Sequence, residues 1–240
     1  MVDFYSTFQN LSLLGKGSYG SVYRASLRGV QGCVKKLSSN HIDCRNEGTV
    51  LQASQGHPNV CKLLSLHWCS ETHAPVLFLE LLAPLPSVMD PCNLHDVSRD
   101  ILSALTYLWR LTIVHNDIKP DNILVRHTRE YVLSDFGSAL TVGPGPLPEG
   151  DGSAEYLPPD RFQCQTGSDL HKVDVYSLGL SLFVLWSGIR PVEISNAFCT
   201  KSVRGFAMTY LAEKSGTLAV LVKHALELLP NRPTAYELLQ

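Results

Sequence analysis

The pattern of hydrophobic and polar residues changes about a third of the way along the chain. Five short apolar segments come first, at 11–14, 21–26, 32–37, 60–67 and 76–82. Their lengths and the glycines near them predict β-strands, the first three as an antiparallel meander. A helical pattern at 46–53 interrupts the series and ends at His57-Pro58-Asn59. The first part of the chain is therefore expected to be β-rich, with one short helix.

The rest of the chain has a mostly helical pattern. Residues 94–111 place four apolar side chains on one face: Val97, Ile101, Leu105 and Leu108. Further helices are expected at 173–186, 218–229 and 234–239. A link with two prolines at 83–86 predicts a boundary between residues 1–82 and 83–240, and a turn-rich segment at 143–152 predicts a surface loop. The expected fold class is α+β, with a small antiparallel β lobe and a larger helical lobe.

Composition narrows the class of protein. The chain has 240 residues, 45% of them hydrophobic and 18% charged, and a net charge of −2. These values are typical of a globular protein and give no reason to expect nucleic acid as a partner. The seven cysteines form no Cys-x-x-Cys pair, which argues against a disulfide framework and favours an intracellular location, cytoplasm or nucleus. No signal peptide is evident, and the most apolar stretch, 175–186, is shorter than the roughly 20 residues of a membrane span.

Candidate chemistry lies in the segment His115-Asn116-Asp117-Ile118-Lys119-Pro120-Asp121-Asn122, followed by Asp135-Phe136-Gly137. Phosphoryl transfer requires a base for the attacking hydroxyl, a cation for the phosphate and oxygen ligands for magnesium. Asp117, Lys119, Asn122 and Asp135 are residue types that meet these requirements. The spacing therefore favours a phosphotransferase.

A second motif, Gly15-Lys16-Gly17-Ser18-Tyr19-Gly20-Ser21-Val22, has the form G-x-G-x-x-G-x-V. Alone it fits a glycine-rich hairpin as well as a phosphate-binding loop. A strand-like segment follows it, whereas a dinucleotide fold would place a helix there, so we expect a flap over nucleotide phosphates.

Lys35 and Lys36 are competing candidates for a phosphate contact on the next strand. Strand alternation points them to opposite faces, so only one can enter a cleft. Lys35 is favoured because Val34 precedes it, as in the Val-Ala-Ile-Lys element. Glu47 is its expected acidic partner.

Taken together, these motifs resemble the eukaryotic protein kinase family over Leu11–Leu239. The resemblance implies two hinged lobes with ATP and Mg²⁺ in the cleft between them. Asp117 looks like the catalytic base, Lys119 like the lysine that neutralises the γ-phosphate, and Asn122 and Asp135 like the magnesium ligands. The nucleotide contacts implied by the resemblance are Leu14, Gly15, Gly17, Gly20, Val22, Lys35 with Glu47, and the hinge residues Glu80 and Leu82, with Leu79 at the back of the pocket. The interval from Lys35 to Glu47 is shorter than this family usually shows.

Three further residues resemble structural elements of the family. Asp160, in Tyr156-Leu157-Pro158-Pro159-Asp160, stands where the family has the glutamate of Ala-Pro-Glu, and would form a bidentate pair with Arg232. Asp174 looks like the helix aspartate that braces the catalytic loop. These residues are expected to support the fold and to take no part in the chemistry.

One position departs from the family. Asn116 stands where many kinases have an arginine that binds a phosphorylated residue of the activation loop, and asparagine carries no charge. We therefore expect activity without phosphorylation of the 135–160 loop, which carries Glu149 and Asp151 and the hydroxyl residues Ser138, Thr141, Ser153 and Tyr156. Lys119, two residues after the base, is typical of kinases that phosphorylate Ser and Thr in protein substrates.

Two alternatives remain beside a Ser/Thr protein kinase. A pseudokinase would bind nucleotide or serve as a scaffold, although Lys35, Asp117, Asn122 and Asp135 are all present. A kinase-like small-molecule phosphotransferase would share the catalytic loop, but Lys119-Pro120 and Phe136 favour a peptide substrate. The compact chain and Asn116 together suggest a divergent member of the family, such as a virus-encoded kinase acting in a host cell.

Overall fold

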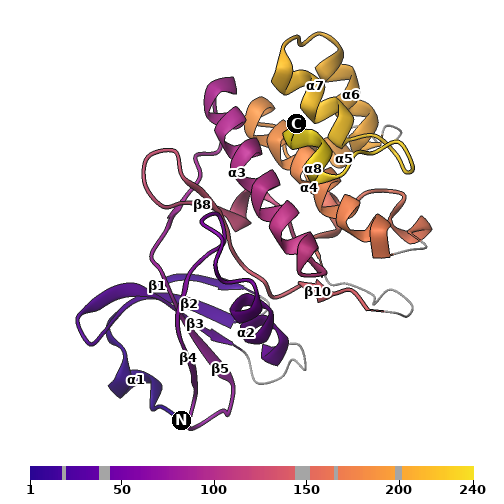
Figure 1. The fold of residues 1–240 in the computed structure, drawn as a ribbon. Helices are drawn as coiled ribbons and strands as arrows, with labels where there is room; N and C mark the ends of the chain where they lie inside the picture. Colours follow the sequence, from indigo (N-terminus) through magenta and orange to yellow (C-terminus); the bar gives the residue numbers. More distant parts are fainter. Residues whose placement is uncertain (18–19, 38–43, 144–151, 165–166, 198–201) are drawn as a thin grey trace.

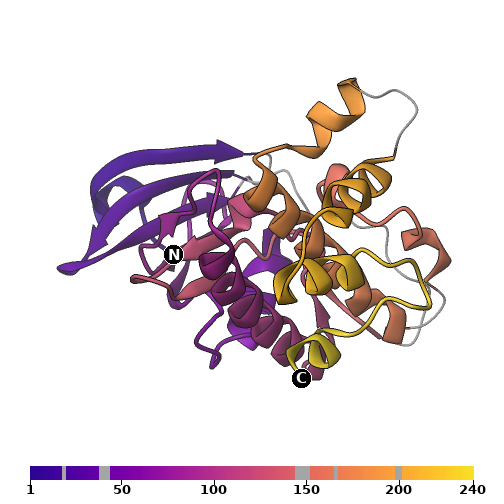
Figure 2. The same ribbon diagram turned by 90° about the horizontal axis from the view of Figure 1, so that it is seen from above.

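The computed structural model describes residues 1–17, 20–37, 44–143, 152–164, 167–197 and 202–240 (Figure 1). The chain forms an antiparallel five-stranded sheet and a helical part, which lie at opposite ends of the molecule in both views (Figure 2). The α+β class and the two lobes predicted from the sequence are therefore present. Most of the predicted loop at 143–152, with Glu149 and Asp151, lies outside the described residues.

The sheet has the strand order β1-β2-β3-β5-β4. Its strands are β1 (Gln9–Gly17), β2 (Gly20–Leu27), β3 (Val30–Leu37), β4 (Leu63–Trp68) and β5 (Pro75–Leu79). The first three form the expected meander, because each pairs with its neighbour in antiparallel register. Helix α2 (Cys44–Ala53) packs against β4 and β5 and buries Glu47, Val50 and Leu51.

Two of the strands are shorter than predicted. The strand expected from residue 60 begins at Leu63, because Val60 instead forms an isolated parallel bridge with Leu133 of the helical part, where Cys61 N donates to Leu133 O. The strand expected to reach residue 82 ends at Leu79. Beyond it the chain leaves the sheet and enters the short strand β6 (Ala83–Pro84), which pairs with β8 (Ile123–Val125). The expected link at 83–86 thus contains a strand.

The N-terminal segment covers the face of the sheet opposite α2. Helix α1 (Phe4–Thr7), which the hydrophobic pattern did not predict, begins at Asp3, whose side chain accepts a hydrogen bond from Ser6 N. Phe4 and Phe8 are fully buried in a cluster with Val34 and Phe78. This cluster is a small hydrophobic core within the β lobe.

The helical part is built on two long helices. Helix α3 (Pro91–Arg110) begins at Asp90, whose side chain accepts from Asn93 N, and buries the predicted apolar face. Helix α4 (Gly167–Ser187) is buried on nearly all sides. The other helices are α5 (Pro191–Ala197), α6 (Val203–Ala212), α7 (Thr217–Ala225) and α8 (Ala235–Leu239). Among the described helices, none is long and apolar enough to cross a membrane.

The helices after α4 differ from the prediction in two respects. Helices α5 and α6 lie between residues 186 and 218, where no helix was expected. Helix α7 ends at Ala225, although the apolar pattern continues to residue 229. The backbone beyond α7 bonds to other elements: Leu226 O accepts from Arg204, and Leu229 N donates to Asp160. These tertiary contacts replace the next helical turn.

Candidate active site

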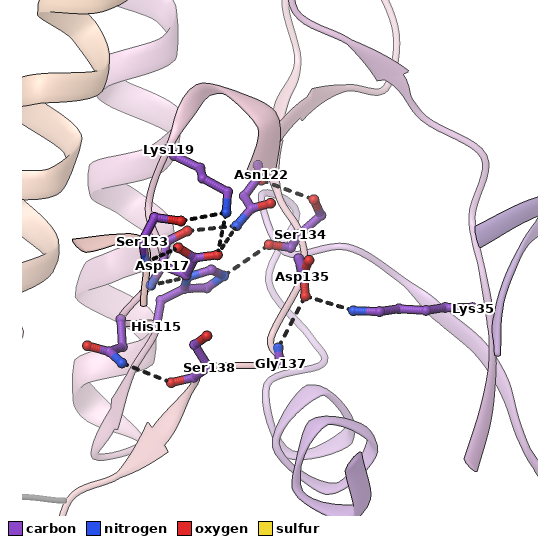
Figure 3. A network of polar contacts seen from close by, with 11 residues as sticks. Lys35, His115, Asp117, Lys119, Asn122, Ser134, Asp135, Gly137, Ser138 and Ser153 are labelled. Carbon is purple, nitrogen blue, oxygen red and sulfur yellow. Dashed lines mark hydrogen bonds and ion pairs between the residues drawn. The ribbon is translucent and has the colours of Figure 1, made fainter. Parts of the chain in front are cut away.

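The site lies where three short strands carry two loops toward the sheet. The strand β7 (Ile113–Val114) leads into the loop 115–122, which ends at β8, and β9 (Tyr131–Leu133) leads into 134–137. Ser134 ties the loops together, because its N and Oγ both donate to Asn122 O, at 2.9 and 3.0 Å (Figure 3). The sequence-predicted residues Asp117, Asn122 and Asp135 are thereby brought to one place.

Asp117 is held on both carboxylate oxygens. Its Oδ2 accepts from Lys119 Nζ and from Asn122 Nδ2, each at 2.9 Å, and its Oδ1 accepts from Ser153 N at 2.9 Å (Figure 3). Burial raises the pKa of Asp117, but the bonds from Lys119 and Ser153 outweigh it, so the pKa lies below the ordinary value. The carboxylate is therefore ionised and fixed in orientation.

Ser153 is a site residue that the sequence named only as a loop hydroxyl. Its Oγ accepts from Lys119 Nζ at 2.7 Å, in addition to the bond from its N–H to Asp117. Its neighbour Gly152 lies so close to the catalytic loop that a Cβ there would come within 2.1 Å of Asn116 O. The glycine before Ser153 was the available sign that this segment approaches another part of the backbone.

Asp174 of α4 fixes the start of the catalytic loop. Its carboxylate accepts from His115 N at 2.7 Å and from Asn116 N at 2.8 Å. Burial raises the pKa of Asp174 to about 7, against the lowering effect of these two bonds. Asn116 has a φ of 66°, a left-handed conformation that these contacts help to maintain. This is the bracing arrangement that the resemblance implied for Asp174.

Lys35 joins the sheet to the second loop. Its Nζ lies 2.7 Å from Glu47 Oε1 and 2.8 Å from Asp135 Oδ1. Burial favours the neutral amine, but the two carboxylates outweigh it and raise the pKa of Lys35. Lys36 lies on the other face, with its Nζ 4.8 Å from the centre of the Phe4 ring. Of the two lysines, Lys35 is thus the one that lies beside Asp135, and Glu47 is its ion-pair partner.

Asn122 and Asp135 present the donor chemistry of a magnesium site. Asp135 has a φ of 60°, and its Oδ1 also accepts from Gly137 N at 3.3 Å. An amide and a carboxylate are hard oxygen donors, which Mg²⁺ prefers. Within the described part of the chain, no group of three or more His, Cys, Asp or Glu residues could hold a metal ion. The pair therefore fits an ion that takes its remaining ligands from phosphate oxygens and water.

The glycine motif joins β1 and β2, as its context predicted. A Cβ at Gly15 or Gly17 would meet nothing within 4 Å, so the backbone there is open to a ligand. Gly20 differs, since a Cβ would come within 2.2 Å of Lys36 O, and its small size is needed for packing on β3. Leu14 is exposed, and Val22 is half-buried opposite Lys35 in the sheet register.

The segment after β5 is anchored through Glu80. Its carboxylate accepts from Arg126 Nε at 2.7 Å and Nη2 at 2.6 Å, and its N–H donates to Lys62 O. Its carbonyl accepts from the Cys33 thiol at 3.6 Å, and Leu79 pairs with Cys33 in the sheet. The sequence did not identify Arg126, which lies far from Glu80 along the chain.

A family model of the protein kinase domain matches residues 8–240. The chain belongs to the protein kinase domain family.

Several curated relatives agree with this assignment. The chain is 29% identical over 189 residues to the serine/threonine-protein kinase PEPKR2 of Arabidopsis thaliana, covering 75% of this chain and 40% of that protein. It is 31% identical over 229 residues to the wall-associated receptor kinase-like 4 of the same plant, covering 85% and 29%. It is 27% identical over 217 residues to the Aurora/IPL1-related protein kinase 2 of Caenorhabditis briggsae, covering 85% and 68%. The chain thus spans less than two thirds of the length of the first two.

In this kinase domain, a buried ion pair joins Asp160, at the end of the 135–160 loop, to Arg232, which lies just before helix α8. Arg232 Nη2 lies 2.8 and 3.0 Å from the two oxygens of Asp160. The expected bidentate pair is thus made by a single nitrogen, because Nε and Nη1 of Arg232 donate to the carbonyls of Glu227 and Lys172. Asp160 also accepts from Leu229 N at 2.7 Å.

Asn116 makes an uncharged contact in this kinase domain. Its Nδ2 donates to Ser138 O at 3.2 Å, on the loop that follows Asp135. Together with the contacts of Gly152 and Ser153, this bond links both described ends of the 135–160 loop to the catalytic loop. The bond from Asn116 is uncharged, the Ser153 N–H donates to the Asp117 carboxylate, and neither bond uses a charged residue of the 135–160 loop.

Proposed function

We propose that this kinase domain transfers the γ-phosphate of ATP to Ser or Thr hydroxyls of protein substrates. The observation that carries the proposal is the orientation of Asp117 by Lys119, Asn122 and Ser153, with Asp135 joined to Lys35 beside it. In this proposal Asp117 is the catalytic base, and Lys119 and Lys35 are catalytic cations. We place the boundary between the β lobe and the helical lobe between residues 82 and 83.

Asp117 performs the first step through a carboxylate oxygen. It accepts the proton of the substrate hydroxyl as the hydroxyl oxygen attacks the γ-phosphorus of ATP and the bond from that phosphorus to the β-phosphate oxygen breaks, which releases ADP. Its lowered pKa keeps the carboxylate ionised beforehand. Lys119 Nζ already donates to Asp117 Oδ2, so it is positioned to balance negative charge that develops between the base and the phosphate. Mg²⁺, held by Asn122 and Asp135, supplies charge neutralisation on the phosphates when it is bound.

The nucleotide lies between the sheet and the helical part. Leu14, Gly15, Gly17, Gly20 and Val22 cover it, and Lys35, fixed by Glu47, contacts its phosphates. The backbone of Glu80 and Leu82 meets the adenine edge, with Leu79 behind it. Because the N–H of Glu80 donates to Lys62 O, its carbonyl oxygen is the group that accepts a hydrogen bond from the adenine.

The main experiment is a peptide-array assay with purified protein, ATP and Mg²⁺, followed by analysis of the phosphorylated amino acid. We expect phosphoserine or phosphothreonine, lost in Asp117→Asn. Products carrying phosphotyrosine alone would reject the Ser/Thr assignment. Nucleotide binding without turnover would favour the pseudokinase alternative, and phosphorylation of an aminoglycoside or choline, but of no peptide, would favour the small-molecule phosphotransferase.

We also propose that activity does not depend on a phosphate in the 135–160 loop. The contacts of Asn116, Gly152 and Ser153 support this, because they hold both described ends of the loop to the catalytic loop without a phosphate on the loop and without an arginine at position 116. Phosphatase treatment, verified by mass spectrometry, should leave kcat/KM unchanged, and Ser138→Ala/Thr141→Ala should behave likewise. Ser153 and Tyr156 are left intact because one contacts Lys119 and the other is buried. Loss of activity on dephosphorylation would contradict the proposal.

Protein substrates within the cell are the partners that follow from this function, with no nucleic acid required. An intracellular location, in the cytoplasm or nucleus, agrees with the cysteine usage of the chain. Fractionation of cells expressing the protein tests this directly.

A further inference from the structure

A cavity of about 420 Å³ lies between α3, α4 and α8, and we call it the α3–α8 cavity. Its walls are Thr106, Trp109 and Arg110 of α3, His171 of α4, and Thr234, Ala235 and Tyr236 at the start of α8. Figure 1 shows α8 beside α4 within the helical part, and α8 packs against both α3 and α4. None of these residues takes part in the proposed phosphoryl transfer. The volume lies within the range of sites that bind small molecules.

His171 is an unsatisfied polar group in the wall of this cavity. The residue is only 9% exposed, and neither ring nitrogen has a hydrogen-bond partner among the described residues. Burial, together with Lys172, lowers its pKa to about 4, so the ring is neutral and has one donor and one acceptor nitrogen. Buried polar groups are normally paired, which marks His171 as a group whose partner is supplied from elsewhere.

The aromatic surroundings of His171 favour a flat ligand. Its ring stacks on Trp109 with the ring centres 4.1 Å apart and the planes 26° from parallel. Each ring nitrogen exposes less than 1 Å² in this position, so the ring must turn to present one to the cavity, and no hydrogen bond with a described residue is broken when it does. Tyr236 adds a third ring at the start of α8. Aromatic walls with few polar groups select planar, largely apolar molecules.

Arg110 adds a positive charge that is unpaired within the described part of the chain. It is exposed in the last turn of α3 and makes no hydrogen bond or ion pair with any residue that the structure describes. Three charged residues besides Arg110 are near the cavity and influence the pKa of His171: Lys172, Asp169 and Glu237. The amine of Lys172 donates to Pro230 O, and the carboxylate of Glu237 accepts from Thr234 N and Oγ1. Arg110 is therefore the lining charge best placed to bind an anionic group.

We propose that the α3–α8 cavity binds a planar, two-ring aromatic carboxylate. Its rings lie against Trp109 and His171, its carboxylate pairs with Arg110, and an N–H or O–H on its ring system donates to the acceptor nitrogen of His171. The site is separate from the nucleotide cleft. This inference does not rest on the proposed kinase activity.

Indole-3-carboxylate tests the proposal, with the uncharged indole-3-carboxamide as its matched probe. Calorimetric titration of the full chain, with the nucleotide cleft filled by a non-hydrolysable ATP analogue, should give saturable binding of the carboxylate. The carboxamide should bind about tenfold more weakly, the loss expected for one charge-assisted hydrogen-bonded pair. Arg110→Gln should abolish this difference between the probes, whereas Arg129→Gln, a change at another exposed arginine, should preserve it.

The role of His171 is tested separately. His171→Phe keeps a ring against Trp109 but removes both nitrogens, and should weaken both probes by about fivefold. In the wild-type protein, the ring nitrogen signals of His171 should shift during titration, a readout that does not depend on the variant folding. Absence of saturable binding, equal affinity for the two probes, full binding by Arg110→Gln, unmoved His171 signals, or displacement by the ATP analogue would each overturn the proposal.

Discussion

Two neighbouring lysines on β3 meet opposite surroundings, and this decides which one can serve the chemistry. Lys35 lies between two carboxylates, while Lys36 lies over the rings of Phe4 and Tyr5 on the other face. Strand alternation alone predicts this division. The partners of each lysine, however, come from segments far away in the sequence.

Replacing Lys35 should therefore affect activity far more than replacing Lys36. Lys35→Met leaves Glu47 buried without its cation and removes the contact that positions Asp135. We expect kcat/KM to fall on the order of 10²–10³-fold, the size of effect seen when one electrostatic contact to a transition state is removed. Lys36→Met is the matched control and should retain most activity. Equal losses in both variants, measured with melting curves to verify folding, would contradict this assignment.

Buried histidine makes stability depend on pH in a defined direction. Burial lowers the pKa of His171 to about 4, so the unfolded chain binds its proton more readily than the folded chain does. This histidine therefore reduces stability as pH falls from about 6.5 toward 4, and has no such effect above pH 7. His171→Phe should weaken the loss of unfolding free energy between pH 7 and 5 by on the order of 1–2 kcal/mol. Urea denaturation at both values measures it, with the exposed His127→Phe as control; parallel pH dependence in wild type and His171→Phe would refute it.

At the scale of elements, one ion pair connects the loop after the active site to the C-terminal helices. Asp160 and Arg232 are 4% and 1% exposed, and Arg232 also bonds to the backbone of residues 172 and 227. Arg232→Leu leaves a buried carboxylate without its cation, at a cost of about 3–5 kcal/mol. Asp160→Leu/Arg232→Leu removes both charges and should recover part of this loss. Thermal or urea unfolding tests both, with the exposed Arg190→Ala as a control of small effect; a double variant less stable than Arg232→Leu would count against a charge origin.

The sequence predicted those elements whose hydrophobic pattern or motif lies within a short stretch of the chain. The long apolar face of α3 and the motif spacing of Asp117, Lys119 and Asn122 are both visible in short windows. Ser153 and Arg126 were missed because their partners, Asp117 and Glu80, lie 36 and 46 residues away. Short α5 and α6 lack a long periodic pattern, and their starts at Pro191 and Ser202 were the signals available. The end of α7 was set by tertiary contacts, which no local pattern contains.

At the scale of the whole molecule, Lys35 and Asp135 connect the sheet to the helical part at the proposed phosphate site. A ligand that contacts both parts binds the folded protein and not the unfolded chain, and therefore stabilises the folded state by mass action. ATP analogue with Mg²⁺ should raise the melting temperature, corresponding to about 2.7 kcal/mol at a hundredfold excess over Kd. Omitting Mg²⁺ should reduce this stabilisation, because the Asp135 carboxylate would then face the negatively charged phosphates without a cation between them.

Two variants separate binding from turnover in that measurement. Asp135→Asn removes a carboxylate ligand and should abolish the Mg²⁺-dependent part of the stabilisation, while Asp117→Asn should retain it. Asp117→Asn should nevertheless lower kcat on the order of 10²–10⁴-fold, because the base acts only in the transfer step. If Asp117→Asn lost nucleotide stabilisation as fully as Asp135→Asn, Asp117 would be a ligand-binding residue and its assignment as the base would fail. Full turnover by Asp117→Asn would exclude that assignment even with binding intact.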